Sequence, residues 1–332
     1  MNRVFGTFGG VGERAMVRRV VAGAVAGAVA AGVVVGGIAG RAIAGFGAGA
    51  GAGVGPEAGA DKAGYHLFNP TPRGLMREMS TDRPDTTESA YTVDAGHVQI
   101  EMSLVDLTFN RRNAESATRR AMAVAPMLVK VGVLNKVDVQ IGIDPYVREE
   151  VRDRGTGVRE TVEGFGDVVV RVKVNLWGND ASGGGEEWWA GGWEGTAFAL
   201  MPFVKFPTAS DRVGNDEFEG GLIAPLAVAL PEGFSLGLMA EIDVNRSGDD
   251  KRYVLDFVHT ATIAHELIGD LSGYLEYAGF ANLNGDEDYR GYFDAGLTLA
   301  VTEDLQLDAG VRMGLTEAAE DLGVFAGISR RF

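Results

Sequence analysis

The sequence predicts an all-β fold, a transmembrane antiparallel up-and-down β-barrel of about twelve strands behind an N-terminal signal segment. Three observations support this prediction. The chain ends on Phe332, after a strand in which Leu322, Val324, Ala326 and Ile328 occupy every second position. From residue 97 onward similar alternation returns in stretches of about ten to fifteen residues, the length that tilted membrane-spanning strands need. The connections between these stretches alternate between short and long.

Residues 1–60 resemble a signal peptide and an Ala/Gly-rich, low-complexity segment, and we expect cleavage on export. They contain, in this order, basic residues, an apolar run and small-residue cleavage motifs: Arg14, Arg18 and Arg19, then 20–38, then 48–50 and 58–60. Met16 is an alternative start. A retained membrane helix is the other interpretation, but repeated glycines weaken it. No later stretch contains eighteen consecutive apolar residues, which excludes a helical membrane protein.

Charge and cysteine content limit the classes of protein that fit. The 332 residues include 30 basic and 46 acidic side chains, a net charge of −16, and no cysteine. Without residues 1–60 the balance is 25 against 44, or −19. Nucleic acid is therefore not an expected partner, because binding it requires a basic face that releases counterions. The lack of cysteine fits a compartment in which a stray thiol is a liability.

Apolar alternation defines twelve predicted strands. In the fourth, valine occupies positions 168, 170, 172 and 174 on one face, while Arg171 and Lys173 lie on the other. A strand of this kind needs lipid or a core on one side and water on the other. The twelve segments are 97–109, 118–134, 137–147, 166–177, 195–206, 218–230, 233–246, 252–266, 270–281, 290–301, 304–315 and 321–332.

The lengths of the connections favour a membrane barrel over a soluble sheet. Connections after even-numbered segments are mostly tight turns, whereas those after odd-numbered segments are longer and polar, as in 148–165, 207–217 and 282–289. An even strand number places both ends of the barrel on the short-turn, periplasmic side, where we expect Phe332 to be part of the assembly signal. The exception is 178–194, a long connection on the short side. It is expected to rest on the inner headgroups or to pack as a loop, because it contains Trp188, Trp189 and Trp193.

A motif ahead of the first strand resembles a known family. Residues 81–89 read Thr-Asp-Arg-Pro-Asp-Thr-Thr-Glu-Ser, and shorter motifs follow in the family's order at 145–147, 164–167 and 205–208. From Thr81 to Phe332 the chain resembles the family named "putative MetA-pathway of phenol degradation". The resemblance implies an outer-membrane barrel of a kind often labelled a transporter. It also suggests uptake of hydrophobic aromatic compounds, without fixing a substrate.

Residues 61–96 form a predicted periplasmic lead ahead of the barrel, which spans 97–332. Two roles are open for it, a plug that folds back into the barrel mouth and an ordered polar turn. In this segment Arg83 is expected to bridge two carboxylates, because a guanidinium offers its donors in a fixed fork. The family motif within the lead consists of Thr81, Asp82, Arg83, Pro84, Asp85 and Glu88.

Alternation also predicts which charged side chains line the interior. Basic residues fall on the second, fourth and fifth strands: Lys130, Arg171, Lys173 and Lys205. Acidic residues fall on the seventh to tenth strands: Glu241, Asp243, Asp256, Glu276 and Asp294. Opposed walls of this kind would create a transverse field that orients dipolar solutes. The alternative is that the charges pair across a narrow, filled interior, because twelve strands enclose little space.

Enzymatic and metal-binding interpretations find little support in the sequence. The four histidines, His66, His97, His259 and His265, show neither a zinc-site spacing nor a nucleophile–histidine pair. Loop 282–288 offers clustered oxygen ligands, but their spacing does not match a full calcium-binding loop. We expect no catalytic residue, no metal and no cofactor.

These observations predict a channel or transporter of the bacterial outer membrane for passive uptake of small, aromatic or hydrophobic solutes. Its expected partners are outer-membrane lipid, the barrel-assembly machinery and a small-molecule solute of unknown identity. A closed barrel with a structural or interaction role through acidic loops is the first alternative. An outer-membrane hydrolase is the second.

Overall fold

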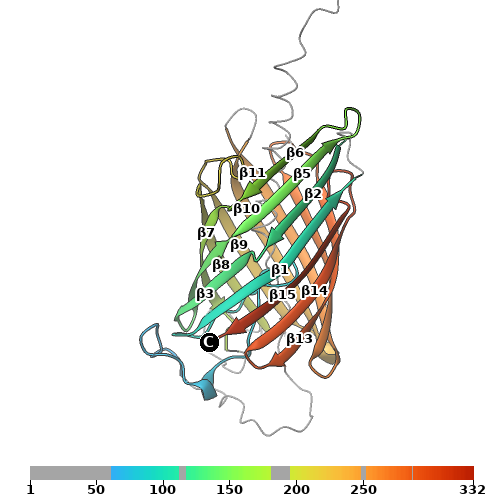
Figure 1. Ribbon diagram of the computed structural model, residues 1–332. Helices are drawn as coiled ribbons and strands as arrows, with labels where there is room; N and C mark the ends of the chain where they lie inside the picture. Colours follow the sequence, from blue (N-terminus) through green and yellow to red (C-terminus); the bar gives the residue numbers. More distant parts are fainter. Residues whose placement is uncertain (1–60, 112–116, 181–194, 248–251, 286) are drawn as a thin grey trace, which may run out of the picture.

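The computed structural model describes residues 61–111, 117–180, 195–247, 252–285 and 287–332. These residues form a closed antiparallel barrel of tilted strands, in which β1 (Val98–Asn110) pairs with β15 (Leu322–Arg331) to close the sheet (Figure 1). The predicted signal segment 1–60 and the three tryptophans of connection 178–194 lie outside the described residues.

Consecutive segments between β1 and β15 either pair as antiparallel neighbours or continue one another in the same strand. They are β2 (Ala117–Val124), β3 (Met127–Leu134), β4 (Val137–Ile143), β5 (Tyr146–Asp153), β6 (Arg159–Gly164), β7 (Val168–Trp177), β8 (Thr196–Phe206), β9 (Glu219–Ala229), β10 (Phe234–Arg246), β11 (Tyr253–Ile268), β12 (Leu271–Asn282), β13 (Arg290–Thr302) and β14 (Leu305–Gly314). Two short 3₁₀ helices, η1 (Arg73–Leu75) and η2 (Pro231–Gly233), complete the described structure.

The barrel has twelve strands, which confirms the predicted number. Three pairs of consecutive segments, β2 with β3, β4 with β5 and β6 with β7, are each one strand with an interruption. The pairing of β1 shows this directly, because residues 98–102 pair with β3 and residues 105–110 pair with β2.

The three interruptions have local causes and lie side by side in neighbouring strands. Ala125, at a φ of 56°, and Pro126, which has no N–H to donate, separate β2 from β3. Pro145 separates β4 from β5, and Phe165–Asp167 separates β6 from β7. Residues inserted in this way leave the regular pairing and favour a local bend of the strand.

The third and fourth strands extend beyond their predicted ends. Residues 148–165 are predicted as a long polar loop, but β5 and β6 occupy most of this segment and pair with each other, as in Val151 with Glu160. The prediction is wrong here because exposed positions of these segments carry charge, as Arg148 and Arg152 do. The alternation is present, but the apolar residues face inward.

The outer face of the barrel is apolar and its interior is polar. The largest fully buried side chains include Lys130, Lys173, Gln140, Glu101 and Glu276. This distribution reverses that of a soluble protein and is the one that a strand wall in lipid requires. No helix in the described part of the chain is long and apolar enough to span a membrane. Exposed apolar side chains on the strands include Leu104, Val204, Leu222, Leu238, Ile242, Val244, Leu255, Ile263, Leu275, Leu297, Leu307 and Val311.

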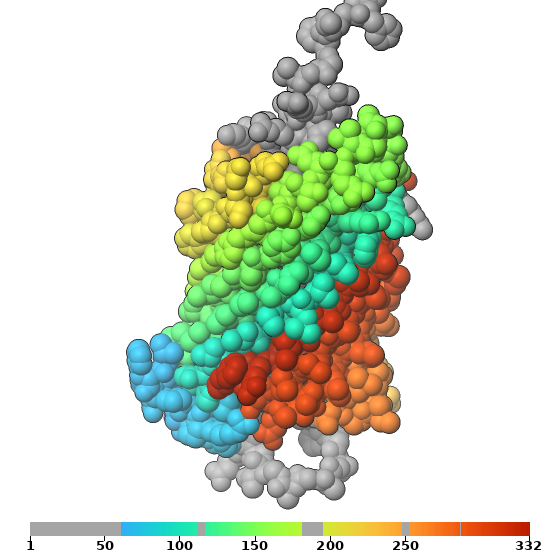
Figure 2. All heavy atoms as spheres, in the orientation of Figure 1, coloured from blue at the N-terminus to red at the C-terminus, as the bar shows by residue number. Residues whose placement is uncertain are grey.

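The lead, residues 61–96, begins at the rim where the chain also ends, and its second half enters the barrel. Its first part, with η1, packs on the outside of this rim (Figures 1 and 2, blue). Residues 81–90 are all buried. The chain returns to the rim at Gly96, where φ is 78° and a Cβ would lie 2.6 Å from Pro70, so glycine is required for the turn into β1.

Candidate functional site

The centre of the candidate site is the interior loop, which we define as residues 78–93. It has no regular secondary structure, and its most buried part, 81–90, is rich in polar side chains. Burial of such a segment is costly unless the wall supplies hydrogen-bond partners. The described wall does so from β1, β3, β7, β10, β11, β12 and β14.

Asp82 is the charge centre at the base of the loop. One carboxylate oxygen lies 2.7 Å from Lys130 Nζ and the other 2.7 Å from Lys173 Nζ. The Asp82 backbone N–H donates to Glu101 Oε2 at 2.8 Å, and Glu101 Oε1 lies 2.9 Å from Lys130 Nζ. Both lysine side chains are fully buried. This cluster of two anions and two cations therefore holds the loop to β1, β3 and β7 at once.

The tip of the loop binds to β11 and β12. The backbone N–H groups of Thr86 and Thr87 donate to the two oxygens of Glu276 at 2.7 and 2.8 Å. The Thr87 hydroxyl lies 2.6 Å from the Thr260 hydroxyl and 2.9 Å from the Thr262 hydroxyl. Glu276, one of the predicted interior acids, therefore recognises the loop backbone rather than a basic side chain.

Arg171, a predicted interior base, forms an ion pair with the loop. Its Nη1 lies 2.6 Å from Glu88 Oε1. The acids predicted to oppose it, Glu241 and Asp243, face inward from β10, and no ion pair of the described residues includes either of them. Asp256 is half-buried and accepts hydrogen bonds from two asparagine amides.

The other predicted interior charges pair with the wall. Lys205 Nζ lies 3.0 Å from Asp167 and 2.8 Å from Glu219. Asp294 lies 2.8 Å from Arg312 Nη2. Opposite charges therefore meet at close range in much of the interior, but the partners of Lys205 and Asp294 belong to neither of the two predicted walls.

The predicted bridge from Arg83 to two carboxylates is wrong. Its Nη2 and Nε donate to the two oxygens of a single carboxylate, that of Asp308 in β14, at 2.8 and 3.3 Å, and Nη1 donates to the Ser103 hydroxyl. The guanidinium fork matches one carboxylate in this bidentate geometry, so no second acid is needed. The other motif residues, Thr81, Pro84 and Asp85, are buried in the same loop.

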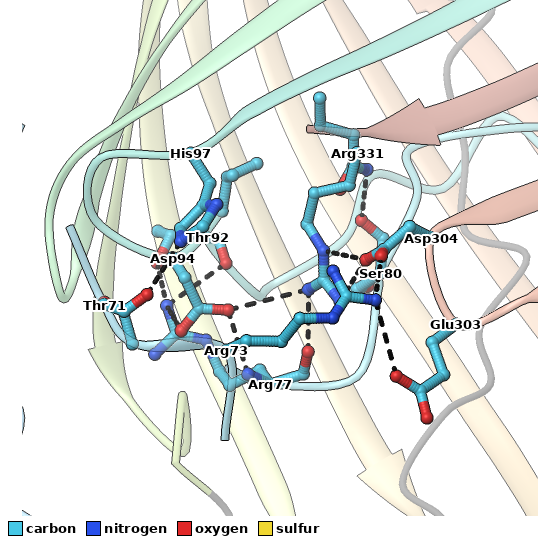
Figure 3. Close-up of polar contacts among 12 residues, drawn as sticks. Thr71, Arg73, Arg77, Ser80, Thr92, Asp94, His97, Glu303, Asp304 and Arg331 are labelled. Atoms are coloured by element: carbon cyan, nitrogen blue, oxygen red, sulfur yellow. Dashed lines mark hydrogen bonds and ion pairs between the residues drawn. The ribbon is translucent and has the colours of Figure 1, made fainter. Parts of the chain in front are cut away.

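A rim clamp fastens the two ends of the interior loop to the rim where the chain ends (Figure 3). It consists of Arg73, Arg77, Asp94, Asp304 and Arg331. Arg77 precedes the loop and Asp94 follows it, and the Arg77 backbone N–H donates to Asp94 Oδ2 at 2.9 Å. Arg331 donates to the Arg77 carbonyl at 2.7 Å and lies 2.8 Å from Asp304, which Arg73 also contacts. The clamp therefore joins both ends of the loop to the last strand.

Asp180, in the turn after β7, adds a contact to the rim clamp. Its Oδ1 lies 2.9 Å from Arg77 Nη1 and 2.7 Å from Lys62 Nζ, and its Oδ2 accepts a hydrogen bond from Asn135 at 2.9 Å. Burial by itself raises the pKa of this carboxyl, but Arg77, Lys62 and Asn135 together lower the pKa from 3.8 to about 2. Asp180 is therefore ionised at neutral pH and holds the start of the lead in place.

An apolar patch lies beside the loop inside the barrel. Phe280 packs against it and meets Tyr292 edge-on, with ring centroids 5.6 Å apart. Met239, a member of the patch, also accepts the Glu88 backbone N–H at 3.4 Å, so the patch and the loop are in contact. Such a surface suits an apolar or aromatic solute. Its buried members are Met201, Ile223, Met239 and Val258.

Sequence reasoning missed most partners of the interior loop. Alternation could have identified Arg331 as an inward-facing residue, because it lies two positions after the inward-facing Ser329 on the last strand. No sequence signal joins Arg83 to Asp308, because that contact depends on the path of the loop through the barrel. The missed residues are Arg77, Asp94, Glu101, Asp304, Asp308 and Arg331.

Of the four histidines, His97 lies at the rim, where its backbone N–H donates to the Asp94 carbonyl (Figure 3), whereas His259 and His265 lie apart from this site. His259 stacks on Phe257 and His265 on Phe234, both on the outer face. Within the described ranges, no group of three His, Cys, Asp or Glu residues is arranged to hold a metal ion.

Comparison with known proteins gives one family and several solved barrels. The family described as "Putative MetA-pathway of phenol degradation" matches residues 81–332. The COG4313 outer membrane channel from Pseudomonas putida F1 is similar with a TM-score of 0.50 at 10% identity, covering 71% of this chain and 95% of that chain. The NanC porin gives 0.43 at 10% identity, covering 70% and 98%. No curated protein matches the sequence.

Proposed function

Because the chain belongs to the "Putative MetA-pathway of phenol degradation" family, we propose that it is an outer-membrane channel for passive uptake of small aromatic or hydrophobic solutes. In this proposal the interior loop is a plug, and the conformation described here is the closed one. The family and the barrel fold support the channel. The interior position of residues 81–90 is the observation that supports the plug.

The attachment of the loop is the reason to treat it as movable. It is continuous with the chain only at its two ends, and every other contact is a hydrogen bond, an ion pair or packing. Withdrawal of the loop toward the periplasm would leave the polar interior open along the barrel axis. It would also expose the apolar patch around Met239 and Phe280, which supports an aromatic or hydrophobic solute.

A permanently closed barrel is the competing function, and one observation favours it. The ion pairs of Asp82 with Lys130 and Lys173 have no access to water, and separation of buried charges is costly. In this case the protein would have a structural or interaction role through its acidic loops, and the interior would conduct no solute.

A disulfide between the loop and the wall separates the two functions. The hydroxyl oxygens of Thr87 and Thr260 lie 2.6 Å apart, so Thr87→Cys with Thr260→Cys places two sulfurs close to a bonding distance of about 2 Å. The chain has no other cysteine, so no other disulfide can form within it. Thr87→Cys alone is the matched control.

Conductance in a planar bilayer, with uptake of a small phenol into liposomes, is the measurement. We expect discrete conductance steps and phenol uptake from the reduced double variant and from the control, and loss of both after oxidation of the double variant. Folded protein with no conductance in any state would support the closed barrel. Equal conductance before and after oxidation would show that the loop is not the plug.

A further inference from the structure

The extracellular end of the outer wall carries exposed arginines in one sector. β2, β5 and β6 place Arg120, Arg148, Arg152 and Arg159 on the outer face, and all four are exposed. This sector faces the viewer in Figure 2, in green. Exposed outer-face positions near this end of other strands are apolar or aromatic, as at Phe206, Tyr253, Met313 and Leu322.

The strand register places these arginines at the edge of the apolar band. Arg120 lies between Phe109 of β1 and Glu150 of β5. One step toward the periplasm, Met122 lies between Leu107 of β1 and Arg148 of β5. Arginine and apolar side chains therefore lie beside one another in these two rows, the mixture expected where lipid chains meet headgroups.

The sector has more positive charge than the described protein neutralises. Arg159 lies 3.3 Å from Glu150 and Arg148 lies 3.6 Å from Glu163, and both are exposed ion pairs of small strength. Arg120 and Arg152 form no ion pair with any residue that the structure describes. Arg152 also pairs directly with Arg159 across the hairpin, an arrangement that destabilises a sheet unless an anion lies nearby. In a chain with a net charge of −16, this concentration of arginine requires a reason.

We propose that this arginine sector, Arg120, Arg148, Arg152 and Arg159, binds the phosphorylated headgroup of an outer-leaflet glycolipid. The guanidinium fork matches phosphate in bidentate geometry, and two phosphates on one sugar headgroup would neutralise several arginines together. The acyl chains of the same lipid would lie along the apolar wall below, at Leu107 and Met122. The inference concerns the lipid face of the barrel and is independent of the proposed channel.

The test uses the full chain in nanodiscs of neutral phosphatidylcholine that contain either a diphosphorylated glucosamine lipid or the same lipid without its phosphates. The test variant is Arg120→Gln with Arg152→Gln, which leaves both arginine–glutamate pairs intact. The readouts are the lipid retained in native mass spectrometry and the midpoint of thermal unfolding. The variant Arg120→Lys with Arg152→Lys keeps the charge and loses the fork. The matched control is Arg330→Gln, an exposed arginine at the periplasmic end of β15.

We expect the phosphorylated lipid to raise the unfolding midpoint of the wild type and of the control, and the glutamine variant to retain at least about tenfold less of it. The lysine variant should retain an amount of the phosphorylated lipid between those of the wild type and the glutamine variant. In purely neutral discs the glutamine variant should be as stable as the wild type or more so, because a repulsive pair is removed, and this also shows that it folds. Equal retention by wild type and glutamine variant would overturn the proposal, as would an equal shift of the unfolding midpoint with the phosphate-free lipid.

Discussion

Asp82 neutralises two lysines that have no access to water. Without its carboxylate, Lys130 keeps Glu101, but Lys173 loses its ion-pair partner and keeps a long contact of 3.3 Å to the Tyr91 carbonyl. Removal of one partner of a buried pair costs about 3–5 kcal/mol. We expect Asp82→Asn to lower the free energy of unfolding by about this amount, measured by urea titration of the refolded barrel.

The control for this substitution is Asp211→Asn, because Asp211 is exposed in a loop. It should change the free energy of unfolding by less than about 0.5 kcal/mol. If the two substitutions had the same small effect, water would have to reach the lysines in the folded protein.

Asp180 makes the docking of the lead dependent on pH. Its pKa is about 2 in the docked state and near 3.8 when released, so the released state takes up the proton more readily. The stabilisation is therefore complete above pH 3.8 and is lost as the pH falls through about 2. We expect backbone amides of 62–77 to be protected from hydrogen exchange at neutral pH and to lose protection in that acidic window.

Asp180→Asn is the matched variant, since it keeps a hydrogen-bonding side chain and cannot ionise. It should show weaker protection at neutral pH and no further loss from this group on acidification. A variant with the pH profile of the wild type would exclude Asp180 as the titrating group.

At the scale of the elements, period-two alternation predicts most strands because lipid faces one side of nearly every one. It fails where lipid contact ends. The outer faces of β5 and β6 carry charged side chains, so alternation predicts a polar loop there instead of two strand segments. It also gives no information on the interior loop, whose side chains follow no period. For the site, alternation identifies inward positions such as Lys130 and Arg171, but it cannot identify their partners, which come from a segment that crosses the barrel.

The break between β2 and β3 offers a test of how these interruptions are stabilised. Ala125 has a φ of 56°, a conformation that costs a residue with a Cβ about 1 kcal/mol. We expect Ala125→Gly to raise the free energy of unfolding by up to about 1 kcal/mol. Ala123→Gly, two residues earlier within β2, should lower it by about 0.5–1 kcal/mol. Destabilisation by both substitutions would show that Ala125 packing outweighs its backbone strain.

At the scale of the whole molecule, the charge of the interior depends on the position of the loop. With the loop inside, Asp82 and Glu88 neutralise Lys130, Lys173 and Arg171. Across the barrel, Glu241 and Asp243 also face inward from β10, with no ion pair to a described residue. Loop withdrawal would expose a basic wall to an acidic wall, so we infer that a transverse field develops only when the channel opens.

Charge exchange between the loop and the wall tests this coupling. Arg171→Glu with Lys173→Glu places acids against Glu88 and Asp82, so repulsion should expel the loop and the acidic interior should favour cations. We expect more frequent conductance steps and a reversal potential shifted toward the cation value. Addition of Glu88→Arg restores an opposite charge at the contact with residue 171, while Asp82 keeps its ion pair with Lys130, and should make opening less frequent again. A change in ion selectivity without more frequent opening would show that these charges act on ions but do not hold the loop. Unchanged conductance in the reversed and restored variants would show that neither contact controls access to the lumen.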